Sequence, residues 1–235
     1  MKTNSKNRRA KGFTLVELLV VVAIIVALAA VAGPNILRMK KKGDLAATTK
    51  SASNLGTAMM EFQMEYSSFP SDATAEAVIN EKGDSKYKLN QLKGANANDY
   101  FRQLLANGYK SEEPFFAKAP YTRKTDNQRD GAEGLAAGEV GYGYIMNGAD
   151  AIPAEDPNLP MAVTPLFNAS TKGEFDTSVY DGKAIMICVD GSVKQLSIRD
   201  DKKANLGKKS LLETGDKTYW GNDIKPTIKP PKKSK

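Results

Sequence analysis

The strongest pattern in the chain is an apolar run near the amino terminus. Residues 13–32 hold a single charged residue, Glu17, among 20 positions rich in Val, Leu, Ile and Ala. A helix of that length rises roughly 30 Å, the thickness of the hydrocarbon core of a bilayer. A helix in a soluble core usually keeps a polar face, and this run has none. The pattern predicts a membrane-spanning helix.

A second helical pattern follows. Apolar or small residues recur every three or four positions at Leu45, Thr48, Ala52, Leu55, Met59, Phe62, Tyr66 and Phe69. This spacing is one face of an amphipathic helix, which we expect to cover a globular head and to end at Phe69-Pro70. Between the two patterns, Gly33 and Pro34 predict a kink or local unwinding, because proline lacks an amide donor and its ring clashes with the preceding turn.

Alternating patterns in the second half predict strands. Residues 139–146 alternate, and residues 184–189 and 192–198 flank Asp190-Gly191, a dipeptide preferred in type I′ hairpin turns. The strand before that turn is apolar on both faces, so both should be covered.

Two short helices are also expected, at residues 74–80 and 98–108. Asn98 would be the N-cap of the second, and Gly108 would lie just past its end. The predicted fold class is therefore α+β, with a long N-terminal helix packed on a small antiparallel sheet.

Composition narrows the chemistry. The chain of 235 residues has no histidine and one cysteine, Cys188, which excludes Ser-His-Asp and Cys-His catalysis, histidine-ligated metals and an intramolecular disulfide. We therefore expect no enzyme. The net charge is +7, but the first 12 residues hold five basic residues and no acid, so the remainder carries only +2. Residues 225–235, rich in Pro and Lys, are predicted to be a disordered basic tail.

The basic residues also bear on topology. Five precede the apolar run, and four follow it closely, at Arg38, Lys40, Lys41 and Lys42. This small excess favours a single span with a cytoplasmic N-terminus and an extracytoplasmic head.

Glu17 has two interpretations, and both are open. A carboxylate in a spanning helix costs about 2.5 to 3.5 kcal/mol, so it usually marks a function or a partner. If the chain were cut between Gly12 and Phe13, the new ammonium could neutralise Glu17, either within one chain or between two chains as a device that sets their register. Alternatively, Glu17 extends to the headgroups and does nothing further.

The run Lys11-Gly12-Phe13-Thr14-Leu15-Val16-Glu17 followed by an apolar helix resembles the class III signal of type IV prepilins and type II secretion pseudopilins. The resemblance implies cleavage after Gly12 by a prepilin peptidase, methylation of Phe13 and assembly guided by Glu17. Ala30-Val31-Ala32 also fits an ordinary secretory cleavage site, but the apolar run is long for such a peptide and Glu17 would be unexplained.

The expected organisation follows from these patterns. Residues 1–12 are a leader, residues 13–42 a transmembrane and assembly helix, residues 43–69 an amphipathic helix, residues 70–224 a globular head and residues 225–235 a tail. The resemblance implies a location in the bacterial inner membrane, and then in a filament in the periplasm or at the cell surface. The implied partners are other pilin or pseudopilin subunits, an assembly platform and its ATPase.

Many type IV pilins close a C-terminal loop with a disulfide, which the lone Cys188 cannot form, and this favours pseudopilin-like members. Major pseudopilins bind calcium in a C-terminal loop, for which the candidates are Asp150, Glu155 and Asp156, with Asn158, Asp126 and Asp130 as further oxygen donors. Their spacing is not that of an EF-hand. No other cofactor is expected.

Three functions remain open. The first is a structural subunit of a type IV pilus or a type II secretion pseudopilus. The second is a DNA-uptake or adhesive minor pilin, which needs a basic aromatic surface for nucleic acid. The third is a membrane-tethered extracytoplasmic domain that never polymerises, which needs a convergent polar pocket.

Overall fold

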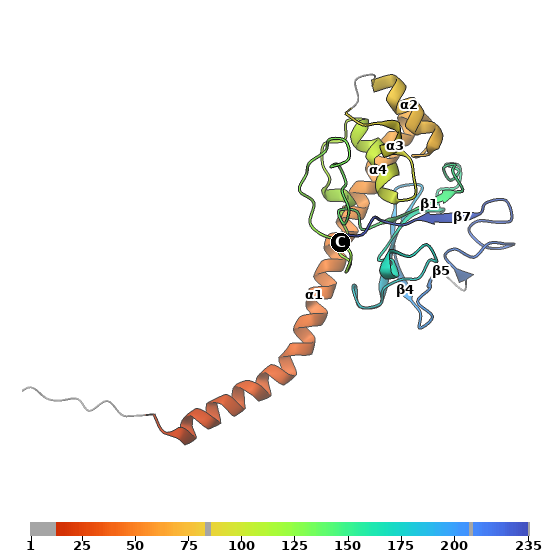
Figure 1. The fold of residues 1–235 in the computed structure, drawn as a ribbon. Coiled ribbons are helices and arrows are strands. Elements are labelled where there is room, and N and C mark those ends of the chain that lie inside the picture. The colour runs from red at the N-terminus through yellow and green to blue at the C-terminus, as the bar shows by residue number, and fades with distance from the viewer. Residues whose placement is uncertain (1–12, 83–85, 207–208, 235) are drawn as a thin grey trace, which may run out of the picture. The chain divides into compact units, whose positions relative to one another are not determined.

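A computed structural model describes residues 13–82, 86–206 and 209–234. The chain forms two compact units, residues 1–40 and residues 41–235, which are described separately. The predicted leader, with its cleavage site at Gly12, lies outside the described residues. Helix α1 (Leu15–Tyr66) contributes to both units (Figure 1). The backbone is helical through Gly33 and Pro34, so local unwinding is absent there, while a kink stays a prediction.

The described residues of the head form three further α-helices, α2 (Asp72–Lys82), α3 (Leu89–Leu92) and α4 (Ala97–Ala106), and two short 3₁₀ helices, η1 (Glu113–Phe115) and η2 (Phe167–Ala169). Helix α2 contains the predicted helix at residues 74–80. Gly108 has a φ of 104° just past the end of α4, as expected.

The sheet has seven strands in the order β6-β5-β4-β3-β2-β1-β7, and each neighbouring pair is antiparallel. The strands are β1 (Gly143–Asn147), β2 (Pro160–Thr164), β3 (Lys183–Cys188), β4 (Val193–Ile198), β5 (Ala204–Leu206), β6 (Lys209–Ser210) and β7 (Pro226–Lys229). The predicted α+β class is confirmed. The strand predicted at residues 139–146 begins later, at Gly143.

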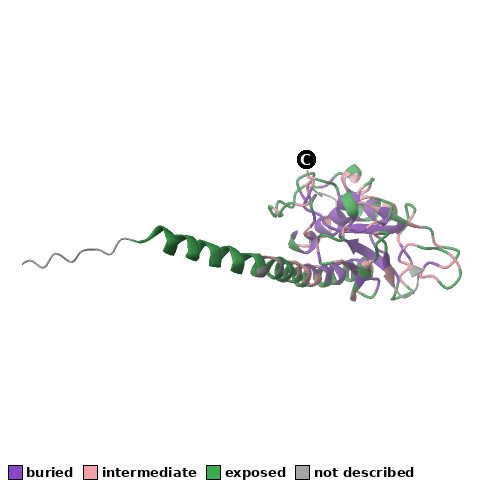
Figure 2. Ribbon diagram, turned by 90° about the horizontal axis from the view of Figure 1, so that it is seen from below, coloured by how far each residue is buried: buried purple, intermediate pink, exposed green. Residues whose placement is uncertain are grey.

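The second half of α1 packs on the head through the predicted apolar stripe, whose central members Ala52, Leu55, Met59 and Phe62 are at most 2% exposed (Figure 2). Tyrosines tie the helix down further. The Tyr142 hydroxyl donates to the carbonyl of Thr48 at 3.2 Å, and the Thr48 hydroxyl lies 3.0 Å from that of Tyr180.

The β3–β4 hairpin is present, but the type I′ turn predicted at Asp190-Gly191 is wrong. A type I′ turn needs positive φ at both residues, and only Gly191 has it, at 75°. The Gly191 amide donates to Cys188 at 2.9 Å, and the Cys188 amide to Ser192 at 2.8 Å, which gives a three-residue loop. This loop touches α1, because a Cβ placed on Gly56 would lie 2.8 Å from the Gly191 carbonyl.

The N-cap of α4 is Asn96, not Asn98 as the sequence suggested. The Asp99 carboxylate accepts the Asn96 amide at 3.1 Å, which fixes the first turn. Asn98 is fully buried instead, where its side chain donates to the Leu135 carbonyl at 2.8 Å and accepts the Lys232 amide at 2.7 Å. Asn98 therefore links α4 to the loop around Leu135 and to the C-terminal segment.

The prediction of a disordered tail is also wrong for residues 225–234, while residue 235 lies outside the described residues. Strand β7 pairs with β1, with Ile228 opposite Ile145, and Ile228 is 5% exposed. Proline is tolerated at the first position of an edge strand, and Pro226 occupies that position. After the strand, the Pro230 carbonyl accepts the amide of Ala97 at 2.9 Å.

Candidate functional site

The described part of the apolar segment has an exposed surface. Every large apolar side chain from Phe13 to Leu28 is exposed, from 44% at Val21 to 78% at Leu15. In the part of the chain that the structure describes, one helix, α1, is long and apolar enough to cross a membrane, and the crossing window contains no buried residue. An apolar surface of this extent requires a cover of lipid or of other protein.

Glu17 is bound to Thr14. Its Oε2 accepts the Thr14 backbone amide and the Thr14 hydroxyl, each at 2.8 Å, while the Glu17 amide donates to the Thr14 hydroxyl at 3.2 Å. Since α1 begins at Leu15, Thr14 is the N-cap and Glu17 the third helical residue, an arrangement known as a capping box. The Thr-x-x-Glu spacing was readable in the sequence and was missed there.

Of the two other predicted processing residues, the structure describes only Phe13. Gly12 lies outside the described residues, and Phe13 is 73% exposed beside the start of the helix. Cleavage, methylation and the assembly role of Glu17 stay predictions at this point.

The structure does not gather Asp150, Glu155 and Asp156 into a set of metal ligands. The Asp156 carboxylate accepts the Asn158 amide at 2.9 Å, which is a local turn contact. Within residues 13–82, 86–206 and 209–234, one group of three carboxylates brings a ligand oxygen of each within 4.8 Å of the others, namely Glu112, Asp126 and Glu139.

The buried members of this group already have hydrogen-bond partners. Glu112 accepts the amide of Leu135 at 2.6 Å, and Glu139 accepts the amide of Ala136 at 2.7 Å. Burial raises the pKa of Glu139, and the nearby charges of Glu112 and Asp126 raise it further, against the opposing Ala136 hydrogen bond and the Arg123 guanidinium at 3.1 Å. These carboxylates therefore anchor two successive amides of one loop.

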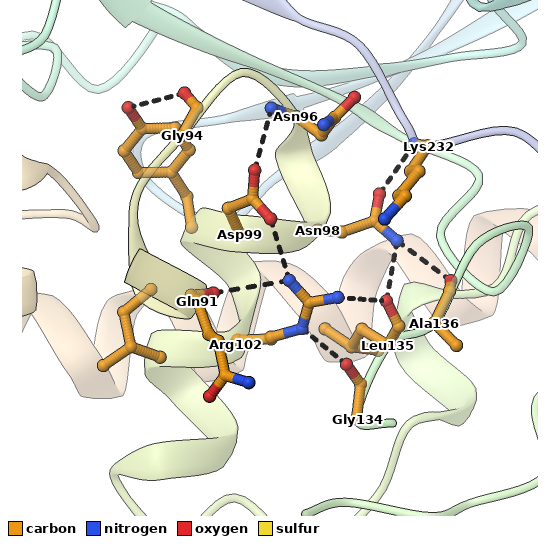
Figure 3. Close-up of polar contacts among 12 residues, drawn as sticks. Gln91, Gly94, Asn96, Asn98, Asp99, Arg102, Gly134, Leu135, Ala136 and Lys232 are labelled. Atoms are coloured by element: carbon orange, nitrogen blue, oxygen red, sulfur yellow. Dashed lines mark hydrogen bonds and ion pairs between the residues drawn. The ribbon is translucent and has the colours of Figure 1, made fainter. Parts of the chain in front are cut away.

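The carbonyls of the same loop are held from α4 (Figure 3). Arg102 donates to the carbonyls of Gly134 at 2.6 Å and Leu135 at 3.2 Å, and it pairs with Asp99 at 2.8 Å. Leu135 has a φ of 48°, an uncommon value for a bulky residue. The hydrogen bonds from both sides fix residues 134–136 in this conformation, so the polar cluster is structural.

Cys188 is the last residue of β3 and has no exposed surface. Burial raises the pKa of its thiol, so the neutral form prevails at neutral pH. The predicted role as a small buried hydrophobe fits this position.

Comparisons with known proteins agree on one family. A model of the prokaryotic N-terminal methylation motif matches residues 7–33. The chain is 32% identical over 113 residues to the type IV wide pilus major component PilA4 of Thermus thermophilus. That match covers 48% of this chain and 84% of the relative. No solved structure matches the chain.

Proposed function

Because the chain belongs to the type IV pilin family, we propose that it is a structural subunit that a prepilin peptidase cleaves after Gly12, that is methylated at Phe13, and that assembles into a type IV pilus through its N-terminal helix. The relative is named as a pilus component, which favours a pilus over a secretion pseudopilus. Before assembly, the subunit is inserted in the inner membrane with its N-terminus in the cytoplasm. An assembly platform and its ATPase then transfer it into the filament.

The exposed apolar surface of residues 13–28 carries this proposal. Lipid covers such a surface as well as other apolar helices do, so the same residues suit both the membrane and the core of a filament. A domain that is only tethered needs a span of this kind but needs no methylation motif at residues 7–33.

Glu17 has an oxygen to offer a neighbour. Its Oε2 is occupied by Thr14, whereas its Oε1 accepts no hydrogen bond from any described residue. We assign Oε1 to the ammonium of Phe13 in an adjacent subunit. This contact neutralises two charges that are costly in an apolar core.

Cleavage is tested by N-terminal sequencing and intact mass of the native protein. We expect an N-methylated Phe13 as the first residue, and a Gly12→Leu variant that keeps the leader. A native protein that starts at Met1 or after Ala32 would contradict the proposal.

Assembly is tested with two variants at one position. Glu17→Gln keeps an acceptor for the Thr14 cap but has no charge, whereas Glu17→Ala loses both. If the charge receives the neighbouring amine, both variants are inserted and cleaved but are absent from sheared filaments. Normal incorporation of Glu17→Gln would reduce Glu17 to a helix cap.

A further inference from the structure

The head carries a basic hollow beside residues 108–110. It has a volume of about 430 Å³, and among the described residues its lining includes four cations, Lys82, Lys86, Lys110 and Arg129, and one carboxylate, Asp130.

Two of these cations are neutralised within the head. Lys82 pairs with Glu65 at 3.3 Å and Lys86 with Asp130 at 2.6 Å. Lys110 and Arg129 have no carboxylate partner among the described residues, and Arg129 donates to the Lys110 carbonyl at 2.9 Å. Both side chains are exposed, so the hollow offers two positive charges to a partner.

The acidic loop that connects β1 and β2 carries unpaired negative charges. Asp150, Glu155 and Asp156 are exposed, and none pairs with a lysine or arginine within the described ranges. The loop is nevertheless held in place, because Ile152 and Leu159 are each 2% exposed in the core. Its charges are therefore presented on a fixed support.

The two surfaces are built from different segments of the head: the loop lies between β1 and β2, whereas the residues that line the hollow come from the ends of α2 and α4 and from residues 86–87, 108–110 and 129–130. No residue of the loop lines the hollow of its own head. Complementary patches at different places on one chain produce a head-to-tail contact that repeats along an open assembly.

We propose that the acidic loop of one subunit docks in the basic hollow of the next, as a second contact between heads in the filament. This rests on the proposed function, since it requires that copies of the chain assemble. A second copy is favoured over nucleic acid as the occupant, because the same chain supplies the complementary charge. Of the two tyrosines in the lining, Tyr87 is 6% exposed and Tyr109 is partly buried against Phe115, whereas grooves for single strands stack bases on exposed rings.

The geometry is tested by crosslinking the full chain in filaments. A chain with both Lys110→Cys and Asp156→Cys, treated with a short bismaleimide, should give a ladder of covalent oligomers. Either substitution alone should give no ladder, because Cys188 is buried and each copy then has one reactive thiol. Filaments without a ladder from the double variant would overturn the docking while leaving the proposed function intact.

The charges are tested by a swap. Lys110→Glu with Arg129→Glu should lower the yield of filaments by about five-fold, and adding Glu155→Lys with Asp156→Lys should restore it. Lys124→Glu with Lys217→Glu, exposed sites outside the hollow, is the matched control and should change little.

Two results of the swap would refute the docking. One is failure of the second pair to restore assembly. The other is binding of an oligo-dT strand that is lost in the Lys110→Glu and Arg129→Glu variant, which would make nucleic acid the occupant. A wild type that forms no filament at all refutes the proposed function itself, and the docking with it.

Discussion

Replacing Arg102 with methionine removes the centre of the buried polar network in the head. The Arg102 side chain is 6% exposed and makes hydrogen bonds to the carbonyls of Gly134, Leu135 and Gln91, besides its pair with Asp99. Methionine fills much the same space but donates no hydrogen bond. The three carbonyls then lose a donor, and the 16% exposed carboxylate of Asp99 keeps only its bond from the Asn96 amide.

The expected loss is large. Breaking a buried ion pair by removing one partner costs about 3 to 5 kcal/mol, and we expect the lower end because Asp99 retains a partner. Arg199→Met is the control, since Arg199 is 58% exposed and lies 3.5 Å from an exposed Asp201. An exposed pair contributes under about 1 kcal/mol.

Urea unfolding of the full chain in detergent measures both variants. Trp220 is the only tryptophan and is 2% exposed, with its indole nitrogen donating to Leu211 at 2.7 Å, so its fluorescence follows unfolding of the head. If Arg102→Met and Arg199→Met lose the same free energy of unfolding, the network does not stabilise the loop.

Three further changes test other parts of the head by the same urea assay. The folded-state pKa of Glu139 is raised above its ordinary value of 4.5, so its contribution to stability falls as pH rises through that pKa. Glu139→Gln should flatten the pH dependence of stability above pH 4.5, and an unchanged slope would contradict this. Gly56→Val should cost about 2 kcal/mol because its Cβ would meet the Gly191 carbonyl at 2.8 Å, whereas Gly43→Val, with open space around it, should cost under about 1 kcal/mol; equal losses would refute the close approach. Ile228→Ala should destabilise the head by about 2 kcal/mol if β7 is part of the core, and a disordered tail would show no change.

Local periodicity predicted the elements that an apolar face defines within one segment. The stripe from Leu45 to Phe62 follows from side-chain spacing, and the β3–β4 hairpin follows from two apolar runs on either side of Asp190-Gly191. The position of Asn98 could not be derived in this way. Its choice between capping α4 and binding Leu135 depends on a loop 37 residues away, and Asn96 offered the same chemistry to the helix end.

The C-terminal segment shows that composition, like periodicity, does not predict contacts with distant parts of the chain. Its prolines and lysines are typical of disorder, yet one alternation at Thr227, Ile228 and Lys229 is enough once β1 offers an unpaired edge. Composition describes a segment in isolation, whereas pairing depends on a strand about 80 residues earlier in the sequence.

The capping box brings together the two interpretations of Glu17 that the sequence left open. A residue in the first helical turn lies where the helix carries its partial positive charge, so the carboxylate is stabilised before any partner arrives. The cap uses Oε2 and leaves Oε1 available. The carboxylate of a subunit that is not yet in a filament therefore already has hydrogen-bond donors for one of its oxygens. The energetic gain from the proposed contact with the Phe13 ammonium of a neighbouring subunit is then smaller than for a carboxylate without this cap. In the filament proposed above, the charge of Glu17 would set the register of the helices, and the apolar surface from Phe13 to Leu28 would supply the greater part of the association energy.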